Sequence, residues 1–183
     1  ERCGTILKSM GSAGRDDLLI RSAPLSEMLD EAAAPHRNRG IRIRLSVPAD
    51  APAVQRDAAL IHGLRNLIQN AVDFASEEVL IEASFDAREI RLRIADDGPG
   101  FPLALLPKIG DPFLTTRPRA EDGRSYEGLG LGLFIAKALL ERSGATIRFG
   151  NSQRGAQVRV IWPRDRIAAD DRVVLGRNPQ IMV

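Results

Sequence analysis

Three short motifs in a fixed order bring chemically capable side chains together between residues 66 and 132. Residues 66–71 (NLIQNA) carry two asparagines at helical spacing, and amide oxygens of this kind can bind a divalent cation. Residues 96–100 (DDGPG) end an alternating strand, where a carboxylate can accept a hydrogen bond from a base amino group. Residues 128–132 (GLGLG) precede a helix, and the N–H groups at a helix start can bind phosphate. Each motif alone has a simpler explanation, but the ordered set predicts a nucleotide pocket.

The first motif lies in a predicted helix, residues 57–75, whose apolar and polar residues separate onto opposite sides. The apolar side holds Leu60, Ile61, Leu64, Leu67, Ile68, Ala71, Val72, Phe74 and Ala75. The opposite side is rich in amides and holds His62, Asn66, Gln69, Asn70 and Asp73. Asparagine is a poor helix former, so its repeated use favours a function such as oxygen donation to Mg²⁺ and hydrogen bonds to phosphate. The alternative is an ordinary solvated face.

The second motif follows a segment, Glu89–Asp96, in which apolar and polar residues alternate. Asp96 has the same parity as the apolar residues, so we predict that Asp96, and not Asp97, is the buried acceptor. Gly98 and Gly100 allow the chain to turn tightly against a ligand. The alternative is a common Asp-Gly turn with two exposed acids.

The third motif places Gly128, Gly130 and Gly132 directly before a predicted helix over residues 131–143. Backbone N–H groups at such a terminus, together with the helix dipole, favour an anion such as phosphate. The run is neither a dinucleotide fingerprint after a first strand nor a P-loop, because no Lys-Ser or Lys-Thr pair follows the last glycine. Glycine runs are weak signals alone, so the helix that follows is part of the argument.

The loop before the third motif, residues 101–127, contains four prolines, mixed charges and no periodicity. We expect a mobile lid, since the loop is much longer than a simple connection needs. Four of its cations could meet phosphates or be solvated: Lys108, Arg117, Arg119 and Arg124.

Other patterns predict the elements around the motifs. Pro24 starts a predicted amphipathic helix that ends near Gly40, Asp57 caps the helix through Ala75, and Gly144 stops the helix that follows the glycine run. Predicted strands cover residues 41–46, 79–85, 89–96, 146–149 and 157–162. We interpret His36 as a surface residue at a helix end, and Phe149 and Trp162 as core strand residues rather than a stacking platform.

The composition fits one globular domain with flanking pieces. The chain has 183 residues, of which 44% are apolar, and its formal net charge is only +2. Its basic residues are dispersed and aromatics are 4%, so the sequence does not indicate nucleic-acid binding. The single cysteine, Cys3, excludes an internal disulfide. No apolar run of about 18 residues occurs, and because the chain begins with Glu1 we expect a fragment or a processed product.

The order of the motifs resembles the catalytic and ATP-binding domain of sensor histidine kinases, within the superfamily of gyrase, HSP90-like chaperones and MutL. Residues 66–71 resemble the N box, residues 96–100 the G1 box, residues 111–113 the F box and residues 128–132 the G2 box. The resemblance covers residues 24–163. We therefore expect an α/β two-layer sandwich (the Bergerat, or histidine kinase ATPase, fold), with a mixed sheet of about five strands backed by three main helices.

Three segments, residues 62–75, 126–137 and 140–145, are similar to the RegB/PrrB/ActS group of redox-responsive sensor kinases. The resemblance implies a parent protein with a membrane sensor region, a histidine-bearing dimerisation hairpin and then this domain. We expect residues 1–22 to be a linker and the end of that hairpin, residues 23–164 the catalytic domain and residues 165–183 a C-terminal tail. The chain would be the cytoplasmic portion of a membrane-anchored kinase, joined to the membrane only through the absent sensor region.

The family also implies roles for individual residues. Asn70 would bind Mg²⁺, Asn66 would assist the phosphates and Asp96 would read the adenine amino group of ATP. The rest of the nucleotide-binding set is Gly98, Gly100, Phe113, Gly128, Gly130, Leu131 and Gly132. Two features depart from the family. Asp73 stands where many members have a basic residue, and neither His36 nor His62 precedes an acid, as a phosphoacceptor histidine normally does.

We therefore expect a protein-histidine kinase fragment, with Asn66 and Asn70 as catalytic residues, that transfers the γ-phosphoryl group of Mg-ATP to a histidine on a separate dimerisation domain. The phosphoryl group would then pass to a response regulator. The alternative is a non-catalytic scaffold that binds nucleotide or a regulator, and a basic nucleic-acid binder ranks below both. A redox role for Cys3 is a further hypothesis.

Overall fold

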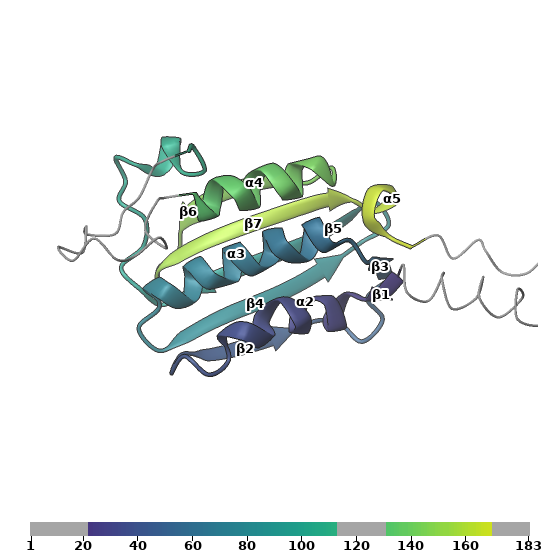
Figure 1. Ribbon diagram of the computed structural model, residues 1–183, viewed down its shortest axis with the longest axis horizontal. Coiled ribbons are helices and arrows are strands. Elements are labelled where there is room, and N and C mark those ends of the chain that lie inside the picture. Colours follow the sequence, from purple (N-terminus) through teal and green to yellow (C-terminus); the bar gives the residue numbers. More distant parts are fainter. Residues whose placement is uncertain (1–21, 113–130, 170–183) are drawn as a thin grey trace, which may run out of the picture.

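The computed structural model describes residues 22–112 and 131–169 (Figure 1). In chain order its elements are β1 (Ser22–Pro24), α2 (Leu25–Ala33), η1 (Ala34–His36), β2 (Arg42–Ser46), β3 (Ala53–Gln55), α3 (Ala58–Phe74), β4 (Glu78–Phe85), β5 (Glu89–Asp96), η2 (Leu106–Lys108), α4 (Gly132–Arg142), β6 (Thr146–Asn151), β7 (Ala156–Pro163) and α5 (Arg164–Ile167).

The larger sheet in the described part of the chain has five strands in the order β2-β4-β5-β7-β6. β2 pairs with β4 in parallel, and the other neighbours are antiparallel. The predicted mixed sheet of about five strands is therefore confirmed. Short turns connect β4 to β5 and β6 to β7. At the β4–β5 turn the Asp86 carboxylate accepts hydrogen bonds from the N–H groups of Arg88 and Glu89 at 2.7 and 2.9 Å.

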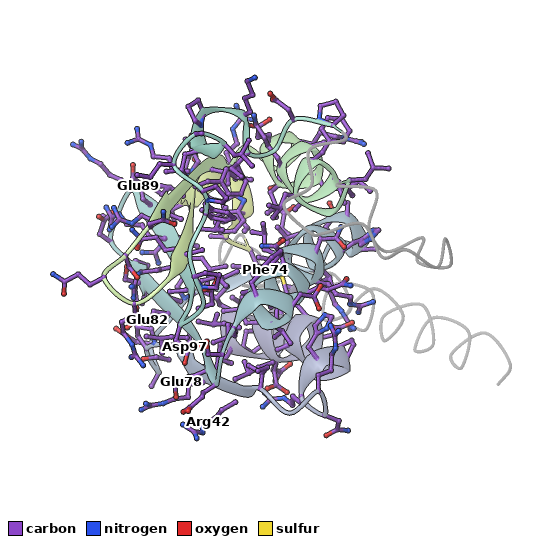
Figure 2. The ribbon with its side chains drawn as sticks, turned by 90° about the vertical axis from the view of Figure 1, so that its left-hand side faces the viewer. Arg42, Phe74, Glu78, Glu82, Glu89 and Asp97 are labelled. Atoms are coloured by element: carbon purple, nitrogen blue, oxygen red, sulfur yellow. The ribbon has the colours of Figure 1, made fainter. Side chains whose placement is uncertain are left out.

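Helices α2, α3 and α4 lie side by side on one face of this sheet (Figure 1), which confirms the predicted two-layer sandwich. The core between the layers includes Leu29, Leu64, Ile81 and Trp162, all at most 1% exposed. The other face of the sheet is charged, and Figure 2 shows Arg42, Glu78, Glu82 and Glu89 on the side away from the helices. Strands with one apolar and one polar face therefore position the site between the layers.

Helix α3 is the central element of the helical layer. Asp57 caps it as predicted, because its Oδ1 atom accepts a hydrogen bond from the Ala59 N–H group at 2.8 Å. Gly63 allows a close approach to α4, since a Cβ atom there would lie 2.8 Å from Leu140 Cγ. The first half of α3 is thus capped and packed closely against α4.

The amino end of the described chain contains a strand pair that sequence patterns did not predict. β1 pairs antiparallel with β3 through three residues of each strand. Pro24 is the residue before α2 and the last residue of β1, one position earlier than its predicted place inside the helix. Runs of three residues are too short to show a period of two, so both strands read as connections.

The end of the first helix also differs from the prediction. α2 stops at Ala33, and a 3-10 turn, η1, continues only to His36, whereas Gly40 takes φ of +83° just before β2. The prediction of His36 as a surface residue is wrong, because its side chain is 6% exposed. η1 contacts α3, and Arg65 of that helix lies close enough to the His36 ring to affect its pKa. Trp162, by contrast, is a core strand residue as predicted, whereas Phe149 is partly buried and packs against the core.

Residues 165–169, which the sequence reading assigned to the tail, continue the described fold. Ile167 in α5 is 2% exposed, Val54 forms an isolated bridge with Ala168, and the Ala169 N–H group donates to the Ala53 carbonyl at 2.9 Å. None of the helices among the described residues is both long and apolar enough to cross a membrane.

Candidate functional site

The candidate site is centred on Asp96, the last residue of β5. Its side chain is 5% exposed, so the predicted burial of Asp96 at the end of an alternating strand is confirmed. Its Oδ1 atom accepts hydrogen bonds from the N–H groups of Gly98 at 2.9 Å and Ala156 at 3.1 Å. Among the described residues, none donates a hydrogen bond to the second oxygen, Oδ2. That oxygen can therefore accept a hydrogen bond from a ligand.

Burial dominates the electrostatics of Asp96. Desolvation raises the pKa of its carboxyl above the ordinary value of 3.8, the two backbone N–H groups oppose the rise, and the neighbouring Asp97 charge adds to it. Burial of a carboxylate in this way reduces the free energy of unfolding, so its position between the layers indicates a function.

Asp97 has a different environment. Its Oδ1 atom accepts hydrogen bonds from the N–H groups of Ser76, Glu77 and Glu78 at 2.9, 3.0 and 3.2 Å. Partial desolvation pushes the pKa of Asp97 upward, but these N–H groups together outweigh it and lower the pKa. Asp97 therefore joins the end of β5 to the segment that leads from α3 into β4, and Figure 2 shows it beside Glu78.

Two glycines close around the Asp96 carboxylate where any side chain would clash. A Cβ atom at Gly98 would lie 2.0 Å from the Phe74 carbonyl oxygen. A Cβ atom at Gly155 would lie 2.5 Å from the Asp96 carbonyl oxygen and 2.7 Å from Oδ1. Only glycine permits this approach of three backbone segments. Sequence patterns indicated Gly98, but Gly155 and the Ala156 N–H group had no assigned contact with Asp96.

The amide face of α3 brings Asn66 and Asn70 onto one side, as the helical spacing predicts. Both side chains are partly buried, and within residues 22–112 and 131–169 the Asn66 Nδ2 atom is buried without a hydrogen-bond partner. A buried amide donor without a partner costs free energy, so its retention indicates a ligand or water that completes the site. Their binding roles stay predictions.

Asp73 lies one turn beyond Asn70 on the same side of α3, and its side chain is 8% exposed. The Nη1 atom of Arg39, from the turn between η1 and β2, lies 2.7 Å from its Oδ1 atom. The acid that departs from the family pattern is therefore matched by a cation from a different element.

Beyond the second motif, Asn151 fixes the chain that leaves the site. The Asn151 amide accepts from the Phe101 N–H group at 2.7 Å and donates to the Phe101 carbonyl at 2.8 Å. Gly100 takes φ of +80°, and a Cβ atom there would lie 2.9 Å from Asn151 Oδ1. The Phe101 ring packs edge-on against Phe149 with centroids 6.2 Å apart. Sequence reasoning missed Asn151, because nothing local links residues 50 positions apart.

Only part of the glycine run lies within the described residues. Leu131 is the residue before α4 and Gly132 is its first residue, as the pattern predicts. The predicted site residues Phe113, Gly128 and Gly130 lie outside the described ranges, as do the loop cations Arg117, Arg119 and Arg124. The described start of the loop contains η2, which ends at Lys108.

The described residues contain no group of three or more His, Cys, Asp or Glu side chains that could hold a metal ion. A cation beside Asn70 would therefore take most of its oxygens from a ligand and from water, which is the usual coordination of Mg²⁺ with phosphates. The arrangement suits a ligand that has a polar ring at one end and phosphates at the other.

Comparison with known proteins identifies the family. Residues 55–166 match the family described as Histidine kinase-, DNA gyrase B-, and HSP90-like ATPase. This match covers more than half of the chain, and it includes α3, β5 and α4. The chain therefore belongs to the histidine kinase-, DNA gyrase B- and HSP90-like ATPase family.

Two curated relatives are similar to this chain in sequence. Sensor histidine kinase RegB of Cereibacter sphaeroides is 48% identical over 97% of this chain and 43% of its own length. Sensor protein KdpD of Clostridium acetobutylicum is 30% identical over 79% of this chain and 16% of its own. The chain thus spans less than half the length of these curated relatives.

Solved structures share the fold. The catalytic domain of histidine kinase ThkA superposes with a TM-score of 0.66 at 25% identity, over 78% of this chain and 93% of that one. The ATP binding domain of PrrB from Mycobacterium tuberculosis gives a TM-score of 0.60 at 22% identity, over 78% and 95%. The expected histidine kinase ATPase fold is confirmed.

Proposed function

We propose that this chain is the ATP-binding catalytic domain of a sensor histidine kinase, which transfers the γ-phosphoryl group of Mg-ATP to a histidine on a separate dimerisation domain. A response regulator would then receive the phosphoryl group. The observation that carries the proposal is the Asp96 carboxylate, 5% exposed, with Oδ1 held by two N–H groups and Oδ2 left for a ligand. Membership of the ATPase family and 48% identity with a sensor kinase support it.

The residues fit a nucleotide on three observations. The Asp96 Oδ2 atom has no donor among the described residues and suits the exocyclic amino group of adenine. Gly98 and Gly155 let backbone segments close around this carboxylate, where a Cβ atom would clash. The buried Asn66 Nδ2 atom has no partner in the described structure and suits a phosphate oxygen. When bound, Mg²⁺ would neutralise phosphate charge, and Asn70 would be its protein ligand.

The chemistry asked of the chain is positioning more than proton transfer. Phosphoryl transfer has a loose transition state, so an aligned acceptor and charge neutralisation matter more than a strong base. α3 contains no glutamate, and its one acid, Asp73, is paired with Arg39. This favours transfer to an imidazole, which needs no base to remove a hydroxyl proton, over hydrolysis by an activated water.

A trans-phosphorylation assay with radiolabelled ATP tests the proposal. The chain alone should not label itself, whereas a supplied histidine-bearing hairpin domain should be labelled. Asn70→Ala should abolish labelling and Mg²⁺-dependent ATP binding, while the neighbouring amide variant Gln69→Ala should retain both. Equal ATP affinity with and without Mg²⁺ would remove the metal role of Asn70. ATP binding without any transfer would favour the scaffold alternative.

For the parent protein, we propose a membrane-anchored kinase of the redox-responsive RegB group, with this chain on the cytoplasmic side. Similarity to RegB over nearly the whole chain supports this. Cys3 lies outside the described residues, and its role in sensing is part of the proposal. Labelling of the hairpin by the full-length protein, compared under oxidising and reducing conditions with Cys3→Ser, would test it.

A further inference from the structure

The amide face of α3 carries a negative charge that a triphosphate site would not tolerate alone. Asp73 lies three residues after Asn70 and seven after Asn66, so helical spacing puts its carboxylate on the same side. The Asp73 side chain is 8% exposed, which limits how far water can screen its charge. Phosphates that approach Asn70 would meet this carboxylate unless another group compensates it.

Arg39 supplies the compensating charge from outside the helix. Its Nη1 atom lies 2.7 Å from Asp73 Oδ1, and 43% of its side chain is exposed. A guanidinium group has five N–H donors in a planar fork, so contact with one carboxylate leaves donors for a second anion. Arg39 can therefore hold Asp73 and a phosphate oxygen at once.

The backbone around Arg39 is held at both ends. Its N–H group donates to the His36 carbonyl at 3.4 Å, and His36 is buried. After Gly40, with φ of +83°, the Arg42 N–H group donates to the Glu77 carbonyl at 2.9 Å, where β2 begins to pair with β4. A side chain on such a fixed turn loses less entropy on binding than one on a free loop.

Arg37, in the same turn, is a natural control. Its side chain is also 43% exposed and also forms an ion pair, but its partner is Asp30 of α2, which is 58% exposed. The two arginines thus match in residue type, exposure and pairing. They differ in direction, since only Arg39 faces the amide-bearing side of α3.

We propose that Arg39 is a positioning residue for the triphosphate of the bound nucleotide, which Asp73 orients over the Asn66–Asn70 face. The inference rests on the proposed function, because it assumes that this face binds phosphates. The role does not come from the three motifs, since Arg39 lies outside all of them. The proposed role of Arg39 also explains the acid at position 73, because Asp73 would hold the guanidinium group in place before the nucleotide binds.

Calorimetric titration of the chain with Mg-ATP and with adenosine tests the inference. Arg39→Ala should weaken ATP binding by about tenfold, as expected for one charge-assisted hydrogen bond at a partly exposed site, and should leave adenosine binding unchanged. Arg37→Ala should change neither affinity. A loss that is equal for ATP and adenosine would show a purely structural role and overturn the inference.

Because Arg39→Ala removes one ion-pair partner of Asp73, the double variant Arg39→Ala/Asp73→Asn provides the decisive comparison. This variant has the same net charge at the site as the unmodified chain and should fold, but it lacks the guanidinium. We expect its ATP affinity to remain about five- to tenfold reduced. ATP binding equal to that of the unmodified chain would overturn the inference, because Arg39 would then only neutralise Asp73. If the unmodified chain failed to bind Mg-ATP, the proposed function itself would fail, which is a separate result.

Discussion

Asp96 and Asp97 are neighbours in the sequence, but the end of β5 gives their carboxylates different surroundings. Asp96 points between the layers, where burial raises its pKa, and it keeps one oxygen for a ligand. Asp97 lies at the rim, where backbone N–H groups outweigh desolvation and lower its pKa. Adjacent residues of a strand face opposite sides, so this division follows from the position of the strand end.

We expect Asp96→Asn to weaken ATP binding by at least about tenfold without unfolding the chain. The amide can still accept the two backbone hydrogen bonds, but it presents an NH₂ group in place of Oδ2, and that group would meet the adenine amino group donor to donor. The unmodified chain should also lose ATP affinity as the pH falls toward the raised pKa of Asp96, because the ionised form is the acceptor. Calorimetry at several pH values measures both effects.

Asp97→Asn is the matched control for this prediction. It should reduce the free energy of unfolding by about 1–2 kcal/mol, because its carboxylate accepts charge-assisted hydrogen bonds from the N–H groups of residues 76–78. Its ATP affinity should stay within about threefold of the unmodified chain, a change of under 1 kcal/mol. If Asp96→Asn bound ATP normally, the base would be read by another group.

Glycines of the second and third motifs should respond differently to alanine. Gly98→Ala should destabilise the chain by more than about 2 kcal/mol, because its Cβ atom would lie 2.0 Å from the Phe74 carbonyl oxygen. Gly132→Ala should be tolerated, since a Cβ atom there meets nothing within 4 Å among the described residues and alanine favours a helix. Urea denaturation measures both. Equal destabilisation by the two changes would contradict this difference.

At the scale of elements, the sequence predicts those helices and strands that are long enough to show a periodic pattern of apolar residues. The long amphipathic α3 and the alternating β5 match their predictions closely, with Asp57 as the cap. β1 and β3 were missed because three-residue strands show no period, and His36 was misplaced because a 3-10 turn changes the direction of the helix. Tertiary context decides such short pieces.

The stability of the segment of residues 101–112 against local opening should depend on Asn151. Its two hydrogen bonds to the Phe101 backbone link this segment to the end of β6. Asn151→Ala removes both, so we expect faster amide hydrogen exchange in residues 101–112, with little change in β4 and β5. Asn151→Asp keeps the acceptor and loses the donor, so its exchange should be intermediate. Unchanged exchange in the alanine variant would show that Phe101 packing alone holds the segment.

The contact between η1 and α3 should make stability depend on pH through His36. Desolvation, followed by the charges of Arg39 and Arg65, lowers the pKa of His36 below 6.5, although hydrogen bonding to the Arg65 backbone opposes this. The unfolded chain therefore takes up the proton first as the pH falls. The contribution of His36 to stability is complete above pH 6.5 and decreases as the pH drops toward the lowered pKa.

His36→Phe should flatten this pH dependence, because an aromatic ring remains at the site and the titrating group is lost. His62→Gln is the control, since His62 is the other histidine of the chain and is exposed. The free energy of unfolding, measured by urea denaturation between about pH 5 and 7.5, decides the outcome. The same slope in the His36→Phe and unmodified chains would assign the dependence to other groups.

At the scale of the whole molecule, the site joins elements that lie far apart in the sequence. Sequence motifs could predict the carboxylate of β5 and the amides of α3, because these are side chains with a spacing. Three other features could not be predicted in the same way, because each depends on a contact across the fold. They are the Ala156 N–H group, the hydrogen bonds of Asn151 to Phe101 and the Arg39–Asp73 pair. Backbone donors carry no side-chain signature at all, so only the sheet register reveals them.

The folded chain should support phosphoryl transfer to a histidine but only very slow ATP hydrolysis. α3 carries no glutamate to activate water, and its single acid is occupied by Arg39, so the isolated chain should release inorganic phosphate from ATP only very slowly. Addition of a histidine-bearing hairpin domain should consume ATP with stoichiometric labelling of the hairpin. Parallel measurement of phosphate release and hairpin labelling tests this. Rapid phosphate release without the hairpin would instead indicate an ATP-driven clamp.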